Sequence, residues 1–326
     1  MSIAQLSGET QGLWIDNSAA TSSSVYVQSG SLLASDTLIG TASGYNSTLT
    51  FGQDTAIGDG SFTNVMGISD IVLTGTSAVT LGAGVASSGG NSLLSAVWGG
   101  SGSSTIAQTA DFINALQLDG SAGSNNYFAI DTAGVISNDT IIGGGGINTL
   151  SLATADTLTD DAFANVRAIN VLTLADGSMA VLGTNAETTG ISTVVGSTGG
   201  ATIDASADGH NLRLDGSAAT AANSLVAGSG NDTLVAGQAA DTLTGGSGAD
   251  EFVIGSRAGV ALVNNFTGAD FLDLPYAASE YSIIGATPQD GSYNQQLFHG
   301  STLIADLNLV SGVDPTTILG SQTHLI

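Results

Sequence analysis

The chain has 326 residues, of which 46 are Gly, 10% are charged and none is Cys. Its 28 acidic residues, 24 Asp and four Glu, face three Arg and no Lys, which gives a net charge of −25. This composition excludes disulfides and thiolate metal sites, argues against nucleic acid and anionic membranes as partners, and favours a divalent cation.

Residues 1–35 form a hydroxyl-rich lead. Its start has neither the basic segment nor the apolar segment of a signal peptide, and no apolar run in the chain is long enough to cross a bilayer. We therefore expect no membrane insertion, and we expect any export signal to lie elsewhere. The lead shows no cap for the end of a stack of strands, so its apolar segments 13–15 and 25–27 are expected to add strands to a neighbouring subunit.

A long repeat with a period of about a hundred residues organises the middle of the chain. The pattern F-x-N-V-x-x-I at 62–68 recurs at 163–169, and short β-branched segments punctuated by Gly, Asn, Asp or Ser predict many strands in each copy. Helical periodicity is confined to 60–64 and 160–165, which we place as single helical turns at corners. The two copies are assigned to residues 36–138 and 139–226.

Three consecutive nonapeptides follow the long repeats: AGSGNDTLV (227–235), AGQAADTLT (236–244) and GGSGADEFV (245–253). The third fits G-G-x-G-x-D-x-U-x at every fixed position, and the first departs from it only at Ala227. The pattern resembles the RTX calcium-binding repeat. The resemblance implies a parallel roll in which Gly-rich turns direct backbone carbonyls inward, Asp adds a charged oxygen, and three residues form a strand.

The predicted fold is therefore all-β. A parallel β-solenoid over the two long repeats is followed by a C-terminal RTX β-roll with its closing segment at 227–274. Residues 275–326 are expected to form a C-terminal cap, and the resemblance implies that they carry an uncleaved signal for type I secretion.

The resemblance implies Ca²⁺ as the bound cofactor. Loops two nonapeptides apart stack on one edge of a roll, so Asp232 and Asp250 are expected to share an ion with glycine carbonyls. On the opposite edge Asp241 is expected to pair with Asn223, and Asp270 is either a ligand of a last half-site or part of a capping turn. The predicted metal residues are Gly228, Gly230, Asp232, Gly246, Gly248, Asp250, Asp241, Asn223 and Asp270.

A degenerate relative of the motif lies upstream, from Gly143 to Asn148, with Asn in the place of Asp. Asn is a weaker calcium ligand than Asp, so we interpret this segment as an Asx turn at a solenoid corner without a metal. The same interpretation applies to Asp36, Asp119 and Asp215.

The sequence contains no recognisable catalytic arrangement. His210, His299 and His324 are isolated in the sequence, and neither H-E-x-x-H nor G-x-S-x-G occurs. The pair Asp160-Asp161 is interpreted as a turn rather than as the acid pair of a glycosidase. The scarcity of Arg and Lys also argues against an anionic polysaccharide substrate, so we predict that the protein is not an enzyme.

The long repeat resembles strand repeats found beside RTX motifs in bacterial surface-layer, filament and adhesin proteins. This implies a secreted, extracellular, calcium-dependent structural protein that assembles with itself at a bacterial surface, with cell-surface polysaccharide as a further expected partner. Two alternatives stay open: an adhesin module for glycan, host or ice surfaces, and a glycan-active β-helix enzyme. Without calcium, the many Asp residues repel one another and are expected to keep the chain expanded.

Overall fold

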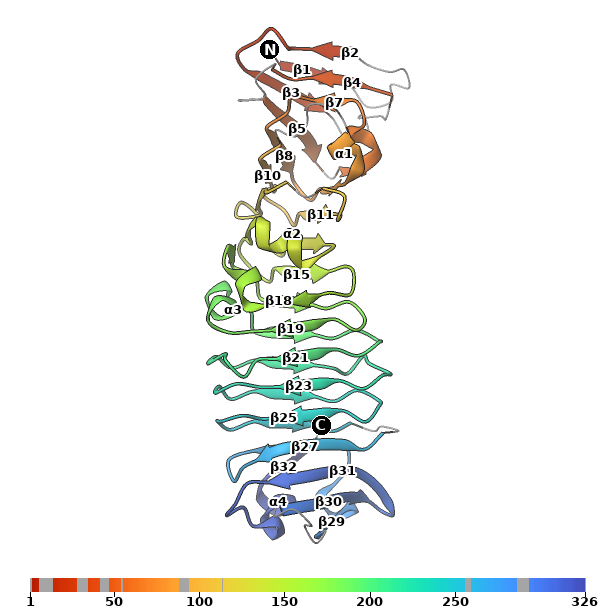
Figure 1. Ribbon diagram of the computed structural model, residues 1–326, viewed down its shortest axis with the longest axis vertical. Helices are drawn as coiled ribbons and strands as arrows, with labels where there is room; N and C mark the ends of the chain where they lie inside the picture. The colour runs from red at the N-terminus through yellow and green to blue at the C-terminus, as the bar shows by residue number, and fades with distance from the viewer. Residues whose placement is uncertain are drawn as a thin grey trace. The chain divides into compact units, whose positions relative to one another are not determined.

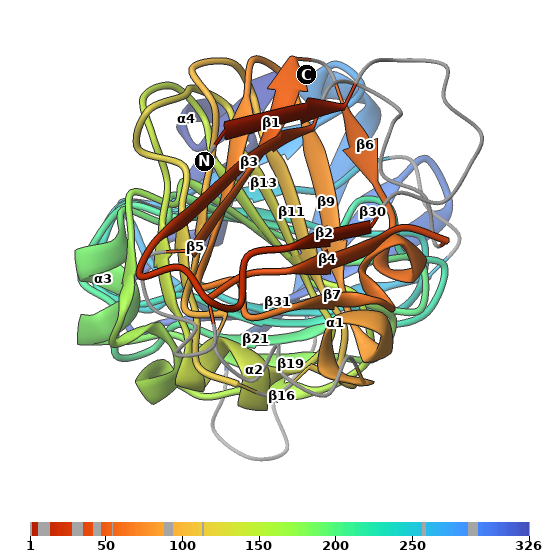
Figure 2. The ribbon, with the colours of Figure 1, turned by 90° about the horizontal axis from the view of Figure 1, so that it is seen from above.

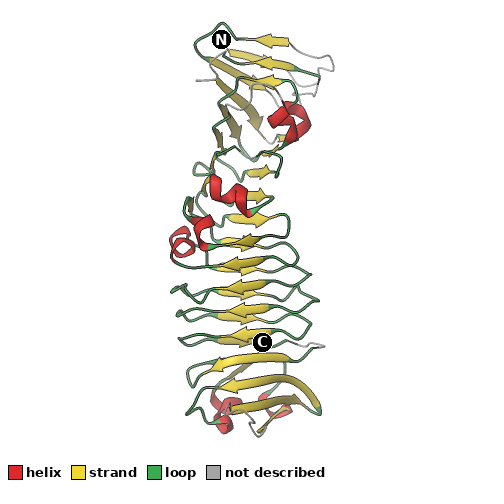
Figure 3. Cartoon of the chain, viewed as in Figure 1, coloured by secondary structure: helices red, strands yellow, loops and turns green. Residues whose placement is uncertain are grey.

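The computed structural model describes residues 2–5, 14–27, 35–41, 47–53, 55–87, 94–112, 114–255, 259–285 and 293–325. Most regular elements are short strands, and the helices are brief segments between them (Figure 3). The chain divides into two compact units: residues 1–153 with 162–170 form unit 1, and residues 154–161 with 171–326 form unit 2. This division falls inside the predicted second long repeat and not at 138/139 or 226/227.

Unit 1 is built from parallel strands that pair with strands one coil away. Its largest sheet contains, in order, β1 (Ser2–Gln5), β3 (Ser23–Val27), β5 (Ser47–Gln53), β8 (Asp70–Thr74), β10 (Ala96–Trp98), β12 (Gln117–Asp119), β14 (Thr140–Ile142) and β17 (Val166–Arg167). A second sheet contains β6 (Ala56–Ile57), β9 (Ala78–Leu81), β11 (Thr105–Gln108), β13 (Tyr127–Ile130) and β15 (Thr149–Leu152). A third contains β2 (Trp14–Asp16), β4 (Thr37–Ile39) and β7 (Val65–Met66).

The N-terminal lead forms coils of its own chain, which corrects our expectation that both of its apolar segments add strands to a neighbour. Val25 pairs with Leu49 as β3 lies beside β5, and Ile15 pairs with Leu38 as β2 lies beside β4 (Figure 2). The alternating burial of β3 explains the pairing, because Val25 and its inward neighbours pack into the core. Leu13 lies outside the described residues.

The two predicted helical turns are confirmed as η1 (Asp59–Phe62) and η3 (Asp160–Phe163). In unit 1 the Asp59 carboxylate accepts hydrogen bonds from the amides of Gly82, Gly84 and Val85 at the start of α1 (Ala83–Ser87). A further helix, α2 (Ala133–Asn138), precedes β14. The first Asp of each turn thus holds the following corner in place.

Unit 2 repeats this plan with more regular coils, and Figure 1 shows its strands stacked as successive rungs. One sheet, here called the β24 sheet, contains β18 (Val171–Thr173), β20 (Thr193–Val195), β22 (Arg213–Asp215), β24 (Thr233–Val235), β26 (Glu251–Val253), β28 (Phe271–Leu274) and β32 (Thr323–Leu325). The other, here called the β25 sheet, contains β16 (Thr157–Leu158), β19 (Met179–Val181), β21 (Thr202–Asp204), β23 (Ser224–Val226), β25 (Thr242–Thr244), β27 (Ala261–Phe266), β31 (Thr302–Leu309), β30 (Tyr293–His299) and β29 (Tyr281–Gly285).

The core of unit 2 comes from the middle residue of each three-residue strand. Leu234 and Phe252 are fully buried in the β24 sheet, as is Leu243 in the β25 sheet. The Phe252 ring lies 5.8 Å from the Phe266 ring, centroid to centroid. Each buried side chain of this size contributes roughly 1.5–3 kcal/mol, so the eighth residue of each nonapeptide stabilises the packing of its own coil. The predicted all-β parallel solenoid is confirmed.

The last fifty or so residues close unit 2, as the expected cap requires. Strands β29, β30 and β31 pair in antiparallel fashion, the first antiparallel pairing among the described strands. The 3₁₀ helix η4 (Ala278–Glu280) leads into β29, and the helix α4 (Pro315–Ser321) follows β31 and leads into β32. Finally β32 returns to pair with β28, and the Gln322 side chain donates to the carbonyl oxygens of Thr267 and Asp270 at 3.0 and 2.9 Å.

Candidate metal centre

The Gly-rich loops 227–232 and 245–250 stack directly on one another at one edge of the β24 sheet. Their strands β24 and β26 pair in register, with Leu234 opposite Phe252. The Ser247 amide donates to the Gly228 carbonyl at 3.0 Å, so the loops are joined through the main chain as well. The predicted stacking of loops two nonapeptides apart is therefore present.

A column of buried carboxylates runs through these loops, formed by Asp232, Asp250 and Asp270 and called the aspartate column below. The Asp250 carboxylate accepts from the Asp232 amide at 2.9 Å, and the Asp270 carboxylate accepts from the Asp250 amide at 2.9 Å. Each of the three residues is at most 1% exposed. The structure thus brings together the two residues predicted to share an ion and adds Asp270 as their neighbour.

Glycine is required where the loops approach each other. Gly246 and Gly248 have φ values of +101° and +135°, which side chains rarely adopt. A Cβ atom at Gly246 would lie 2.1 Å from the Gly228 carbonyl oxygen, and one at Gly248 would lie 2.0 Å from that of Gly230. All four predicted glycines therefore form the contact surface between stacked loops, where main-chain oxygens crowd.

The aspartate column carries negative charge that the protein does not neutralise. Burial raises the pKa of Asp250 to about 7 against the hydrogen bond from Asp232, and the nearby Asp270 and Asp232 carboxylates raise it further. Burial also raises the pKa values of Asp232 and Asp270. Among the described residues, no Arg or His forms an ion pair with the column, and the buried Oδ2 of Asp250 has no hydrogen-bond partner.

These features fit Ca²⁺. The ion binds about six to eight oxygen atoms, and carboxylates together with main-chain carbonyls are its usual protein ligands. A cation at the column would offset the repulsion between neighbouring carboxylates and supply a partner for the orphaned Asp250 oxygen. Asp232 and Asp250, with the carbonyls of Gly228, Gly230, Gly246 and Gly248, are the residues that would hold it.

Asp270 forms the capping turn, one of the two roles that the sequence left open, and its role as a calcium ligand stays a prediction. Its Oδ2 atom accepts from the Thr267 amide at 2.6 Å, which forms a capping turn, while its Oδ1 atom joins the column through Asp250. Gln322 then covers the main chain of this turn. Asp270 therefore ends the column, and its carboxylate remains beside that of Asp250.

The opposite edge pairs Asn223 with Asp241, as predicted. The Asp241 carboxylate accepts from the Asn223 main-chain amide at 2.7 Å, from the Asn223 side-chain amide at 3.1 Å and from the Gly237 amide at 2.7 Å. The Asn223 side chain also donates to the Gly216 carbonyl at 3.2 Å. The Asp241 carboxylate thus accepts hydrogen bonds from amides of Asn223 and Gly237, and calcium binding here stays a prediction.

The upstream relatives of the motif form a ladder of side-chain amides in unit 1: Asn126, Asn148 and Asn170, called the amide ladder below. The side-chain carbonyl oxygen of Asn148 accepts from the main-chain amide of Asn126 at 2.8 Å. In the same way, the side-chain carbonyl oxygen of Asn170 accepts from the main-chain amide of Asn148 at 2.9 Å. The Asn148 side chain donates to the carbonyls of Gly144 and Ala168. The Asn148 NH₂ group thus gives both of these carbonyl oxygens a donor, and a turn without metal stays our prediction here.

Asp119 and Asp215, two of the residues that we assigned to turns, lie in turns, whereas the turn assigned to Asp36 stays a prediction. Asp119 and Asp215 accept from the amides of Ser121 and Ser217, two residues on, at 2.8 and 2.9 Å. Asp160 accepts from Gly183, Asn185 and Ala186 at the start of α3 (Thr184–Thr189), with the same capping role that Asp59 has in unit 1.

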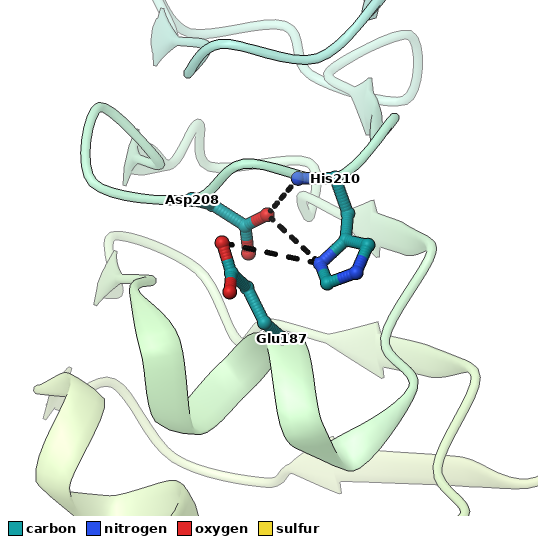
Figure 4. Close-up of side chains that lie close together, drawn as sticks. All are labelled: Glu187, Asp208 and His210. Carbon is teal, nitrogen blue, oxygen red and sulfur yellow. Dashed lines mark hydrogen bonds and ion pairs between the residues drawn. The ribbon is translucent and has the colours of Figure 1, made fainter.

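Sequence reasoning missed two clusters because it treated each His as isolated. Asp208 is buried, and the His210 ring lies with Nδ1 3.9 Å from carboxylate oxygens of both Asp208 and Glu187 (Figure 4). The second cluster consists of Glu251, Asp273 and His324. In the first cluster Asp208 and His210 lie two residues apart in one loop and Glu187 comes from the preceding coil, so the Asp-x-His spacing was an available signal. The second cluster joins three strands, β26, β28 and β32.

Comparison with known proteins supports the calcium loops. The family model of the RTX calcium-binding nonapeptide repeat matches residues 134–151 and 218–252, in four copies. The chain thus carries RTX nonapeptide repeats. The second RTX match contains Asn223, Asp232, Asp241 and Asp250, and because this nonapeptide is a calcium-binding motif, Ca²⁺ is the ion implied for the aspartate column. The first RTX match contains Asn148, where the motif has Asp and the structure has the amide ladder.

No curated protein and no solved structure matches the chain. A search of the described helices finds none with the length and apolar character needed to cross a bilayer. The similarity to known proteins is therefore that of the RTX repeats, and the functional interpretation depends on the chemistry of their loops.

Proposed function

We propose that this RTX-repeat protein is a secreted, non-catalytic structural protein that folds with Ca²⁺ and assembles with itself into an extracellular layer, filament or matrix at a bacterial surface. The observation that carries the proposal is the buried aspartate column, whose carboxylates have no basic partner among the described residues. Such a column is costly to bury without a cation and stabilising with one.

Calcium binding makes the folding of unit 2 depend on the calcium concentration, which is low inside the cell and millimolar outside it. An ion that binds only the folded chain stabilises it by about 2.7 kcal/mol when its concentration is one hundred times the dissociation constant. At low calcium, repulsion within a chain of net charge −25 opposes compaction. An expanded chain suits export, and millimolar calcium outside the cell then favours the solenoid.

Self-assembly is supported by the sheet edge of unit 1. Among the described residues β1 pairs only with β3, so its other edge presents unpaired main-chain amides and carbonyls. Trp14, on the edge strand β2 of another sheet, is 72% exposed. Exposed strand edges of this kind pair readily with another chain, and we propose that a second copy supplies that strand.

Electron microscopy and light scattering of the purified protein test this proposal. With millimolar Ca²⁺ we expect sheets, filaments or defined oligomers, and with chelator we expect loss of both assembly and most β-type circular dichroism. A protein that stays monomeric at high concentration with calcium would overturn the assembly proposal. Unchanged β content after chelation would overturn the calcium proposal separately.

An adhesin that binds surface polysaccharide is the second candidate, and Trp98 favours it. This residue lies on β10, is 38% exposed, and donates from Nε1 to the Asp70 carboxylate at 3.1 Å, which fixes its ring at the surface. A fixed, exposed aromatic ring with polar neighbours is suited to stacking on a sugar. Binding to glycan arrays that Trp98→Ala abolishes would favour the adhesin over a purely structural role.

A further inference from the structure

A second group of metal-ligating side chains lies on the outer face of the β24 sheet, away from the loops. Glu251, Asp273 and His324 belong to β26, β28 and β32, three neighbouring strands. Phe252 and Leu272 point into the core, so the flanking Glu251 and Asp273 point outward. Asp273 and His324 are direct partners across β28 and β32.

The spacing of the three groups matches a small metal ion. The His324 Nδ1 atom lies 3.3 Å from a Glu251 carboxylate oxygen and 3.2 Å from Oδ1 of Asp273, and all three ligand atoms lie within 4.8 Å of one another. A tetrahedral ion with bonds of about 2.0–2.1 Å places its ligand atoms roughly 3.3–3.4 Å apart. The distances from the His324 nitrogen to the two carboxylates are therefore close to those between the ligand atoms of such a site.

The Asp273 carboxylate gives an independent indication of a ligand. Asp273 is only 7% exposed, and its buried Oδ1 atom has no hydrogen bond, although it is directed at the His324 ring nitrogen. Burial raises the pKa of Asp273, and repulsion from Glu251 adds to this effect. A neutral His324 imidazole does not offset the repulsion between the two carboxylates, whereas a metal cation bound to all three groups would.

The orientation of the imidazole is fixed by packing. The His324 ring stacks on the Phe271 ring with centroids 4.6 Å apart and planes 14° apart. This contact holds Nδ1 toward the two carboxylates, while half of the His324 side chain remains exposed to solvent. Water or a group from another molecule can therefore complete the coordination shell from the solvent side.

We propose that Glu251, Asp273 and His324 bind a transition-metal dication of the Zn²⁺ class at a site separate from the calcium loops. The imidazole nitrogen decides the class, because nitrogen ligands suit Zn²⁺ and its neighbours whereas Ca²⁺ takes oxygen ligands. The bound ion links β32 to β26 and β28, and so fastens the closing strand of the sheet.

The cluster of Glu187, Asp208 and His210 does not meet the same conditions. Its ring nitrogen lies 3.9 Å from each carboxylate, and it contains no buried carboxylate oxygen without a partner among the described residues. His210 therefore serves as a matched control: a His beside one Asp and one Glu in the same unit.

Zinc titration of the full-length protein, kept saturated with Ca²⁺, tests the proposal by isothermal calorimetry. We expect one Zn²⁺ per chain, an affinity reduced roughly tenfold or more in His324→Ala, and unchanged binding in His210→Ala and His299→Ala. Co²⁺ should give the visible absorption of a tetrahedral site in the parent protein and in both controls, and lose it in His324→Ala.

Circular dichroism with calcium checks that each variant folds. If His324→Ala does not fold, Glu251→Gln takes its place, since it retains β32 and removes one ligand. The proposal is wrong if the parent protein binds no Zn²⁺ at millimolar concentration, or if binding is unaffected by both Glu251→Gln and His324→Ala. Loss of zinc binding in His210→Ala alone would place the site in the other cluster and would equally overturn it.

Discussion

The side-chain amide of Asn148 donates a hydrogen bond to the Gly144 carbonyl oxygen at 2.8 Å. In the calcium loop of unit 2 the corresponding relationship has the opposite polarity, because the Asp232 carboxylate accepts from the Gly228 amide at 3.3 Å. An Asn side chain supplies a donor of its own, whereas an ionised Asp side chain only accepts, so a cation can take the place of the missing donor. We therefore predict that this one atom, nitrogen in place of oxygen, distinguishes coils that fold without metal from coils that bind calcium.

Replacing Asp250 by Asn should convert a calcium loop into an amide loop. We expect Asp250→Asn to bind at least one Ca²⁺ fewer than the parent protein and to be more stable in chelator by roughly 1–3 kcal/mol, since a buried unpaired carboxylate is removed. Calcium calorimetry and chemical unfolding in chelator measure the two effects. The reverse change, Asn148→Asp, is the control and should lower stability in chelator.

Gly248 should be intolerant of a side chain. Gly248→Ala places a Cβ atom 2.0 Å from the Gly230 carbonyl oxygen at a φ of +135°, so we expect a loss of roughly 2 kcal/mol or more and weaker calcium binding. Gly255→Ala is the matched control, because nothing lies within 4 Å of its Cβ position. Equal thermal unfolding of the two variants in calcium would show that the loops do not stack as described.

Asp139 should make the stability of unit 1 depend on pH. Burial raises the pKa of Asp139 from 3.8 to about 7 against hydrogen bonds from Leu116 and Gln108. The folded state holds this proton more tightly than the unfolded state, so the contribution of Asp139 to stability is complete below about pH 4 and is lost as the pH rises to about 7.

Asp139→Asn removes that loss. We expect the variant to exceed the parent protein in stability by about 2–4 kcal/mol above pH 7 and to resemble it below pH 4. Urea unfolding across this pH range gives the difference directly. The exposed Asp161→Asn should show no such divergence, and a constant offset between Asp139→Asn and the parent protein would contradict the assignment.

Asp160 should stabilise the corner at α3. Its carboxylate accepts three main-chain amides, from Gly183, Asn185 and Ala186, so Asp160→Ala should cost roughly 1–3 kcal/mol and expose the Ala186 amide to hydrogen exchange. The neighbouring Asp161→Ala changes an exposed side chain and should have little effect. Similar exchange rates in both variants would show that the cap is dispensable.

The sequence predicted what recurs at a fixed period. Asp232 and Asp250 could be placed on one edge because eighteen residues complete one coil of the roll, and the same reasoning placed Asp241 beside Asn223. The helical turns at η1 and η3 were also visible, since both copies of the long repeat carry them. Periodic features fix position along a solenoid, and position decides which side chains meet.

What the sequence did not predict depends on coils of unequal length. Asp273 meets His324 only because β32 returns to the sheet after an antiparallel hairpin and α4, and no period connects the two residues. The lead was misjudged for a different reason: the apolar alternation around Val25 fits a neighbouring subunit and the chain's own β5 equally well. Only the pairing partner, which sequence does not encode locally, distinguishes them.

The position of Gln322 in the sequence determines when the last turn of the aspartate column can close. Its side chain seals the turn that ends the aspartate column, and the rung beside it is drawn from residues 323–325, more than fifty residues beyond Asp270. Because ribosomes build a chain in one direction, Gln322 is synthesised only after the whole aspartate column. Synthesis of the aspartate column and closure of its last turn are therefore separate events. In the interval between them, the nascent chain can still be exported before the turn is closed.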